Sequence, residues 1–115
     1  MRVKNGSKYG AKPVTIDGIT FDSQAEGARY RALKMLERAG EITGLELQPV
    51  FVLAPGVLVP GETRKRPPLR YMADFAYTDQ AGRRVVLDVK GVQTPVFRMK
   101  MHLLALQGIK VEIVK

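Results

Sequence analysis

The sequence predicts an α/β fold in which a central mixed sheet of about four strands is flanked by two helices, in the order αβββαβ. Two segments, residues 23–39 and 94–107, carry apolar residues at helical spacing. The segments between them are rich in Val, Leu, Phe and Tyr and are separated by turn-forming residues. The pattern ends with a strand, a helix and another strand. Such a crossover connection makes the last strand parallel to its neighbour.

The 115 residues are expected to form one domain, with residues 1–13 as a flexible basic segment that contains Lys8 and Lys12. No apolar run approaches the roughly 18 residues of a membrane span, and the first residues lack the apolar core of a signal peptide. A cytosolic protein that does not contact membranes is therefore expected.

The composition narrows the classes of partner and of chemistry. Nineteen Lys and Arg against eleven Asp and Glu give a formal charge of +8, which attracts polyanions. DNA is the expected partner, although such a charge also serves solubility alone. The absence of cysteine excludes disulfides, thiolate zinc sites and a cysteine nucleophile, and the single histidine, His102, excludes a cluster of His ligands.

The first elements follow from turn and cap signals. Val14–Phe21 holds two β-prone runs around Asp-Gly, which predicts a hairpin. A helix is expected from about Ser23 to Ala39, ended by Gly40. Glu26 falls on the shoulder of the buried face, and Arg29, within the apolar arc, is in position to pair with it. Ser23 and Glu26 also fit a capping box, in which Glu26 would accept only from the N–H of Ser23.

A β-type pattern runs from Ile42 to Leu58, with Pro49 at an edge or a bend. A loop follows over residues 60–68, and its centre has the densest positive charge in the chain, at Arg64, Lys65 and Arg66. This loop either contacts phosphates or is simply solvated.

Two strands, Leu69–Tyr77 and Arg84–Lys90, are expected to pair through a three-residue loop. If Asp79 faces Arg83 across this loop, counting back puts Asp74 opposite Asp88, with Cβ atoms about 5 Å apart. Like charges opposed across a sheet destabilise it unless a cation lies between them.

A second helix is expected from Thr94 to Gln107, followed by Gly108 and a last strand over residues 109–114. Arg98 and Lys100 near its start, together with the N-terminal segment and the basic loop, would hold DNA phosphates. His102 is read as a packing or surface residue.

Four side chains are thus predicted to converge: Glu26, Asp74, Asp88 and Lys90. Oxygen ligands suit Mg²⁺, with Mn²⁺ as a substitute, and the lysine would stabilise charge on a phosphate or orient a water. The chemistry indicated is phosphodiester hydrolysis. The alternative for Asp88 and Lys90 is an edge-strand ion pair.

The sequence resembles the PD-(D/E)XK, or restriction-endonuclease-like, nuclease superfamily from about Phe21 to Val114. The resemblance rests on a helix Glu followed by Ala-Asp-Phe at residues 73–75 and Asp-Val-Lys at residues 88–90. Ala73 replaces the proline of the signature. Phe21–Glu26 and Asp88–Thr94 look most like a small phage and prophage family catalogued as a domain of unknown function. The order is also similar to phage junction-resolving endonucleases and to the nuclease subunit of heteromeric transposases.

This resemblance implies a restriction-endonuclease-like core in which Asp74, Asp88 and the carbonyl of Val89 bind the metal. Glu26 would complete the metal shell, Lys90 would be the motif lysine, and Gln48 would support the site. The expected activity is a Mg²⁺-dependent DNA endonuclease acting on branched or structured DNA during phage replication, recombination or packaging in the host cytosol. Junction resolution would require a homodimer. The competing classes are a DNA-binding protein of this fold that cuts nothing and a protein that binds an acidic partner.

Overall fold

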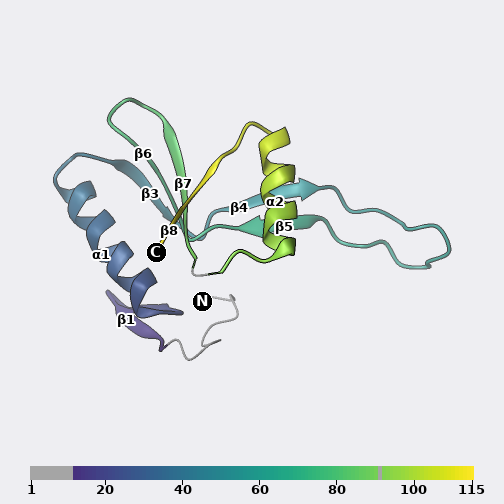
Figure 1. Cartoon of the computed structure of the whole chain (residues 1–115), viewed down its shortest axis with the longest axis horizontal. Helices are drawn as coiled ribbons and strands as arrows, with labels where there is room; N and C mark the ends of the chain where they lie inside the picture. Colours follow the sequence, from purple (N-terminus) through teal and green to yellow (C-terminus); the bar gives the residue numbers. More distant parts are fainter. Residues whose placement is uncertain (1–11, 91) are drawn as a thin grey trace.

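A mixed four-stranded sheet with strand order β3-β6-β7-β8 forms the centre of the computed structural model, which describes residues 12–90 and 92–115 (Figure 1). The first three strands are antiparallel, and β8 runs parallel to β7. In chain order the core elements are α1 (Gln24–Arg38), β3 (Thr43–Leu47), β6 (Phe75–Thr78), β7 (Arg84–Val89), α2 (Pro95–Leu106) and β8 (Val111–Val114). This is the predicted αβββαβ order. In the part of the chain that the structure describes, neither helix is long and apolar enough to cross a membrane.

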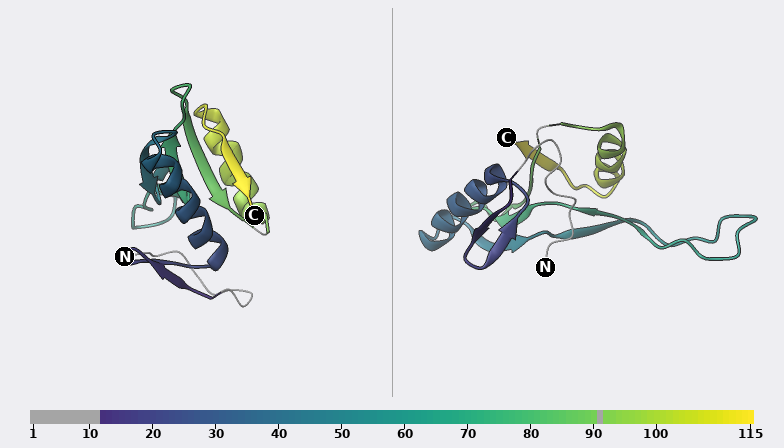
Figure 2. Two further views of the ribbon diagram at one scale, coloured as in Figure 1. Left: turned by 90° about the vertical axis from the view of Figure 1, so that its left-hand side faces the viewer. Right: turned by 90° about the horizontal axis from the view of Figure 1, so that it is seen from below.

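The two helices cover opposite faces of this sheet. In the left view of Figure 2, α1 lies in front of the sheet and α2 behind it. Phe75 and Leu87 pack toward α1 in one buried cluster, whereas Ala76 and Val86 belong to the cluster on the α2 side. Successive strand residues point to opposite faces, so the two cores lie back to back across the sheet.

Both helices begin and end within one residue of their predicted bounds. Ser23 Oγ accepts from the backbone N–H of Glu26 at 3.1 Å, and Thr94 Oγ1 accepts from that of Phe97 at 3.1 Å. Each hydroxyl satisfies one of the N–H groups that a helix start leaves unpaired. Gly40 and Gly108, both with φ of 78°, follow the C-caps as expected.

The predicted hairpin is present as β1 (Val14–Ile16) and β2 (Ile19–Phe21), which pack on α1. Its two turn residues have positive φ, as a tight two-residue hairpin turn requires. Gly27 of α1 allows the close approach, because a Cβ there would lie only 2.6 Å from Cγ1 of Val14. The hairpin therefore braces the start of α1.

The remaining strands, β4 (Val50–Ala54) and β5 (Leu69–Met72), continue β3 and β6 outward as one long hairpin. A single register runs from the Leu47 and Phe75 pair to the Val50 and Met72 pair. Two backbone bonds bridge the junction, from Gln48 N to Asp74 O at 2.9 Å and from Ala73 N to Pro49 O at 3.0 Å.

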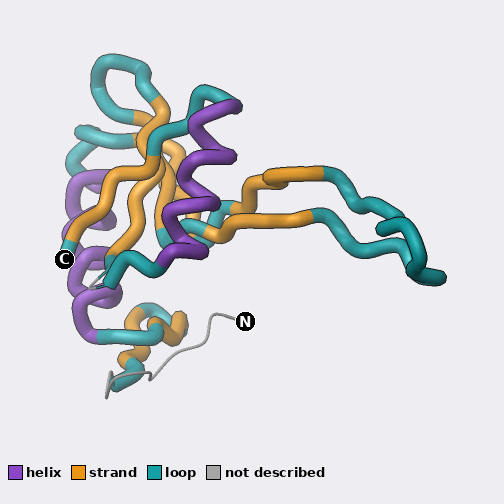
Figure 3. Tube along the Cα trace, turned by 45° about the vertical axis from the view of Figure 1, so that its right-hand side comes forward, coloured by secondary structure: helices purple, strands orange, loops and turns teal. Residues whose placement is uncertain are grey.

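The chain bends at this junction, so the prediction of an unbroken strand over Leu69–Tyr77 is wrong. Gln48 has φ of 54°, a left-handed conformation that is uncommon for any residue but glycine. Pro49 was predicted to lie at an edge or a bend, and it directly follows the bend at Gln48. Figures 1 and 3 show the outer half of the hairpin, residues 50–72, extending away from the sheet; we call it the β4–β5 arm.

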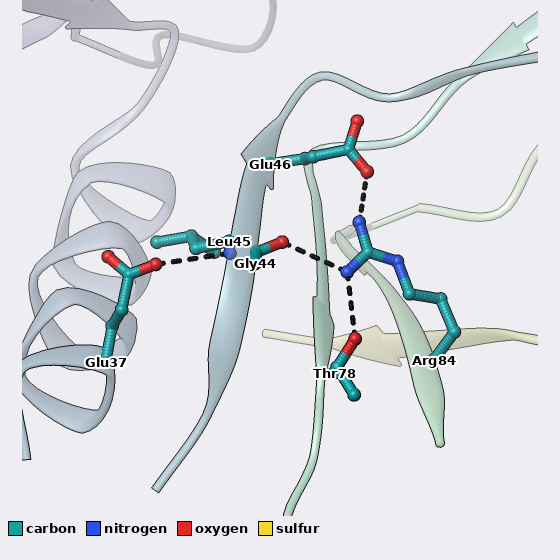
Figure 4. Close-up of polar contacts among 6 residues, drawn as sticks. All are labelled: Glu37, Gly44, Leu45, Glu46, Thr78 and Arg84. Carbon is teal, nitrogen blue, oxygen red and sulfur yellow. Dashed lines mark hydrogen bonds and ion pairs between the residues drawn. The ribbon is translucent and has the colours of Figure 1, made fainter. Parts of the chain in front are cut away.

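The opposite end of the sheet is tied together by side chains (Figure 4). Arg84 of β7 donates to Gly44 O at 3.0 Å and to Thr78 Oγ1 at 3.3 Å, and it forms an ion pair with Glu46. Glu37 near the end of α1 accepts from Leu45 N at 3.2 Å. These contacts attach β3 both to α1 and to β7.

Replacing Glu37 with glutamine is expected to lower the free energy of unfolding at neutral pH by about 0.5 to 1 kcal/mol. The hydrogen bond from Lys34 and then that from the Leu45 N–H hold the pKa of Glu37 below its usual value. The stabilisation of the fold by Glu37 is therefore complete at pH values above the pKa of a glutamate in the unfolded chain. It is lost as the pH falls through the pKa of Glu37 in the folded protein.

Urea denaturation from neutral pH to about pH 3 measures this effect. The wild type should lose more stability on acidification than Glu37→Gln, while Glu41→Gln, a substitution at an exposed glutamate just beyond the helix, should follow the wild type. Parallel curves for wild type and Glu37→Gln would refute this role of Glu37.

Candidate functional site

A pocket of about 680 Å³ opens where β7 ends and the β4–β5 arm leaves the sheet. The start of α1, strand β5, the end of β7 and the start of α2 all contribute to its wall. Its charged lining residues are Asp22, Glu26, Arg70, Asp74, Lys90 and Lys100.

Asp74 and Asp88 meet at this end of the sheet because of the β6–β7 register. The strands pair from Thr78 with Arg84 to Phe75 with Leu87, and one further step opposes Asp74 and Asp88. This is the register predicted from the turn. Only 2% and 1% of the two aspartates is exposed. Asp74 Oδ2 accepts from Val89 N at 2.8 Å, so its side chain bonds directly to the end of β7.

Lys90 is fixed beside this pair. Its backbone N–H donates to Val114 O at 2.9 Å, which anchors it to β8. Its Nζ lies 3.9 Å from Asp88 Oδ2 and 4.9 Å from the centre of the Phe97 ring. The ammonium group is thus close to both a carboxylate and an aromatic face.

Tyr71 is a site residue that the sequence reading missed. It is buried, and its hydroxyl donates to Asp88 Oδ2. Burial raises the pKa of Tyr71, and the negative charge of Asp88 raises it further, so the phenol stays neutral and keeps its proton for the bond. Tyr71 and Asp74 are an odd number of residues apart, which in an unbroken strand would put them on opposite faces. The bend at Ala73 and Asp74 removes that alternation.

Glu26 faces the same pocket from the first turn of α1 and is 4% exposed. Its Oε1 accepts from the N–H of Asp22 at 3.1 Å. The predicted donor to Glu26 was the backbone N–H of Ser23, so the actual donor is the residue before the predicted one. The carboxylate stabilises the start of the helix and also contributes negative charge to the pocket.

The three carboxylates do not form one cluster. Within residues 12–90 and 92–115, no group of three or more acidic or histidine side chains is close enough to hold a metal ion. The sequence predicted that Glu26 and the two aspartates share one metal shell. Among the described residues, the structure does not bring them together in this way. Asp74 and Val89 line the pocket, and Asp88 is the next residue along β7 from Val89. Carboxylate and carbonyl oxygens are hard donors, and Mg²⁺ or Mn²⁺ uses one or two carboxylates with water and phosphate.

Neither of the predicted supporting residues contributes to the described lining of the pocket. Gln48 lies at the bend, past the end of β3, and its backbone N–H donates to Asp74 O at 2.9 Å. Arg29 was predicted to pair with Glu26. The positive charge of Arg29 acts on Tyr77 and opposes the rise in the pKa of Tyr77 that burial causes.

The predicted DNA-contacting cations are divided among several surfaces. Lys100 lines the pocket, joined by Arg70, which the sequence reading did not select. Arg98 lines a second hollow beside Met99 and His102, so Arg98 and Lys100 do not share one surface. The basic loop is exposed at the end of the β4–β5 arm, and Lys12 is exposed before β1. Lys8 lies outside the described residues, and His102 is exposed as expected.

Comparison with known proteins gives one match. A family model described as "Protein of unknown function (DUF1064)" matches residues 6–114. No curated protein and no solved structure matches the chain. The family match agrees with the expected likeness to a family catalogued as a domain of unknown function.

Replacing Tyr71 with phenylalanine should cost about 1 to 3 kcal/mol of stability at neutral pH, because Asp88 loses this donor while it stays buried. The raised pKa of Tyr71 adds a pH dependence. The stabilisation by the neutral phenol is complete below the ordinary tyrosine pKa of about 10 and is lost as the pH rises further toward the folded-state value.

Urea denaturation at neutral pH and at about pH 10.5 separates the two effects. Tyr71→Phe should be less stable than the wild type at neutral pH, and the difference should shrink at the alkaline pH. Equal stability of the two proteins at neutral pH would show that the hydroxyl does not stabilise Asp88.

Proposed function

The chain belongs to the DUF1064 family, and we propose that it is a Mg²⁺-dependent DNA endonuclease with a restriction-endonuclease-like core. The observation that carries the proposal is the buried pair Asp74 and Asp88, opposed across β6 and β7 beside Lys90. The αβββαβ order and the spacing of these residues support the likeness to the nuclease superfamily.

Electrostatics favour a divalent cation at this pair. Two ionised carboxylates at adjacent positions repel each other, and burial raises the cost because water no longer screens them. The neutral donors on Tyr71 and Val89 and the ammonium group of Lys90 reduce this repulsion. A hard cation held by the two carboxylates and the Val89 carbonyl would reduce it further.

The chain's own residues then have separate roles in hydrolysis. Bound Mg²⁺ would neutralise charge on the phosphate and lower the pKa of a water molecule. Lys90 faces the pocket and would stabilise the charge that develops on the phosphate and help to orient the attacking water. Tyr71 holds Asp88 in one orientation. Arg70 and Lys100 on the pocket wall would hold the neighbouring phosphates of the strand.

A second candidate is a DNA-binding protein that keeps the fold and does not cut. Arg70 and Lys100 on the pocket wall favour it, because contacts between cations and phosphates hold DNA without a metal ion. The charge of +8 serves either activity equally.

Cleavage assays with Mg²⁺ or Mn²⁺ on supercoiled, linear and four-way-junction DNA test the proposal. Asp74→Asn, Asp88→Asn and Lys90→Ala should each lower the cleavage rate by about 100-fold or more, because they remove the cation's ligands or the phosphate's counter-charge. Glu112→Gln and Lys110→Ala, exposed substitutions at the β8 end of the sheet, are matched controls and should cleave at the wild-type rate.

Two results would contradict the endonuclease proposal. Equal cleavage by the wild type and the three site variants would assign the activity to another site or to a contaminant. Binding with a steep salt dependence but no cleavage with either metal would establish the non-cutting DNA-binding protein.

Glu26→Gln separates capping from catalysis. The amide oxygen of glutamine can still accept from the Asp22 N–H, so the free energy of unfolding should fall by no more than about 1 kcal/mol, from the loss of the charge at the helix start. The loss of negative charge from the pocket should lower cleavage by roughly tenfold. Unfolding and cleavage measured on the same preparation test both expectations, and wild-type cleavage would limit Glu26 to capping.

A further inference from the structure

The β4–β5 arm extends along the longest dimension of the molecule, which measures 54 Å against 36 and 24 Å for the other two (Figure 3). Its strands pair from Val50 with Met72 to Ala54 with Leu69. Its far end carries the basic loop, whose role the pocket by itself does not explain.

Local contacts keep the outer part of the arm ordered. Val57 and Arg66 exchange backbone hydrogen bonds of 3.1 and 2.7 Å beyond the end of the strands. Gly56 makes this pairing possible, since a Cβ there would lie 2.7 Å from the carbonyl oxygen of Arg66. Glu62 binds the guanidinium of Arg66 through two hydrogen bonds of 2.9 and 2.5 Å. The cations at the end of the arm are therefore held at a defined distance from the sheet.

The base of the arm is fixed to the candidate site. Phe51 and Leu53 pack against the buried cluster on the α2 side of the sheet. Gln107, the C-cap of α2, donates from Nε2 to Val52 O at 2.8 Å. Arg70 and Met72 line the pocket. A ligand that follows the arm inward is thus led to the pocket that Asp74 and Lys90 line.

The charge of the arm matches a polyanion. Residues 50–72 contain four cations and one acid, for a net charge of +3 (4 − 1). Glu62 pairs with Arg66, whereas Arg64 and Lys65 are exposed and form no ion pair within residues 12–90 and 92–115. Exposed apolar side chains accompany them along the arm and can pack on sugars; they are Val50, Val52, Val57, Leu58 and Leu69.

The reach of the arm follows from its residue count. Lys65 lies seven residues from Met72, which lines the pocket. At about 3.3 Å per residue in a strand, the separation is about 23 Å. B-DNA rises about 3.4 Å per base pair, so this length corresponds to about seven base pairs.

We propose that the β4–β5 arm lies along duplex DNA on one side of the pocket, with Arg64 and Lys65 on phosphates about seven base pairs from the position at the aspartates. Cleavage at the pocket rests on the proposed function, whereas DNA binding by the arm does not. The substrate is therefore duplex on the arm's side of the cut.

A second copy of the chain is the competing occupant of the arm, because the exposed apolar side chains would also suit a partner strand. The net charge of +8 opposes self-association and favours DNA. Light scattering of the wild type without DNA tests this alternative. A dimer that Val52→Ser/Leu69→Ser dissociates would overturn the proposal.

The binding experiment uses fluorescence anisotropy on a duplex of about 20 base pairs, with Ca²⁺ in place of Mg²⁺, over a range of salt concentrations. Arg64→Ala/Lys65→Ala should lower the slope of log Kd against log salt by about two, because two phosphate contacts are lost. Arg31→Ala/Lys110→Ala removes the same charge from exposed positions on α1 and before β8, and its slope should stay near that of the wild type. Equal slopes for the two double variants would overturn the proposal.

Two further measurements address geometry. Gly56→Val keeps every charge of the arm but breaks the pairing of Val57 with Arg66, and it should weaken binding to the 20-base-pair duplex about as much as the loss of both cations. Once a cut is mapped, the duplex on one side of it is shortened to about four base pairs. This change should slow cleavage by the wild type about tenfold and leave the cleavage rate of Arg64→Ala/Lys65→Ala unchanged. Binding without any cut would sink the endonuclease proposal alone, whereas cutting that ignores duplex length would sink the arm proposal alone.

Discussion

The structure depends on the bend in the long hairpin formed by β3, β4, β5 and β6. Backbone hydrogen bonds continue across the bend at Gln48 and Ala73, so the register of the sheet carries over into the arm. The change of direction turns Asp74 toward the end of β7 and brings Tyr71 to the same side. The left-handed conformation of Gln48 is the local strain that the surrounding pairing sustains. The carboxylate site and the protruding arm are therefore two consequences of one backbone feature.

The balance of charge at the site explains its polar surroundings. Asp74 and Asp88 are almost fully buried, and a backbone N–H, a neutral phenol and one ammonium group contact them. Neutral donors fix the orientation of a carboxylate without cancelling its charge, as the proposed cation site requires. Basic residues also lie on the pocket wall and along the arm, where the proposed function has them contact phosphates.

The sequence predicted the elements and the β6–β7 register because both depend on local signals. Ser23, Thr94 and the glycines mark the helix ends, and the Asp79 turn determines which residues of the two strands face each other. It did not predict features that depend on distant contacts. The bend at Ala73 has no local marker on its own strand, so Leu69–Tyr77 was predicted as one strand and Tyr71 was not selected as a site residue. The position of Glu26 relative to the aspartates depends on how α1 docks on the sheet, which periodicity does not determine.

In the proposed function, the hairpin bend builds a divalent-cation site from Asp74 and Asp88. Titration of Mn²⁺ into isotope-labelled protein, followed by NMR, tests it directly, because the paramagnetic ion broadens the resonances of nearby nuclei. Broadening should appear first at the amides of Asp74, Asp88 and Val89, and it should disappear in Asp88→Asn while the remaining spectrum is retained. Broadening confined to other acidic residues, or none at these three amides, would contradict the account.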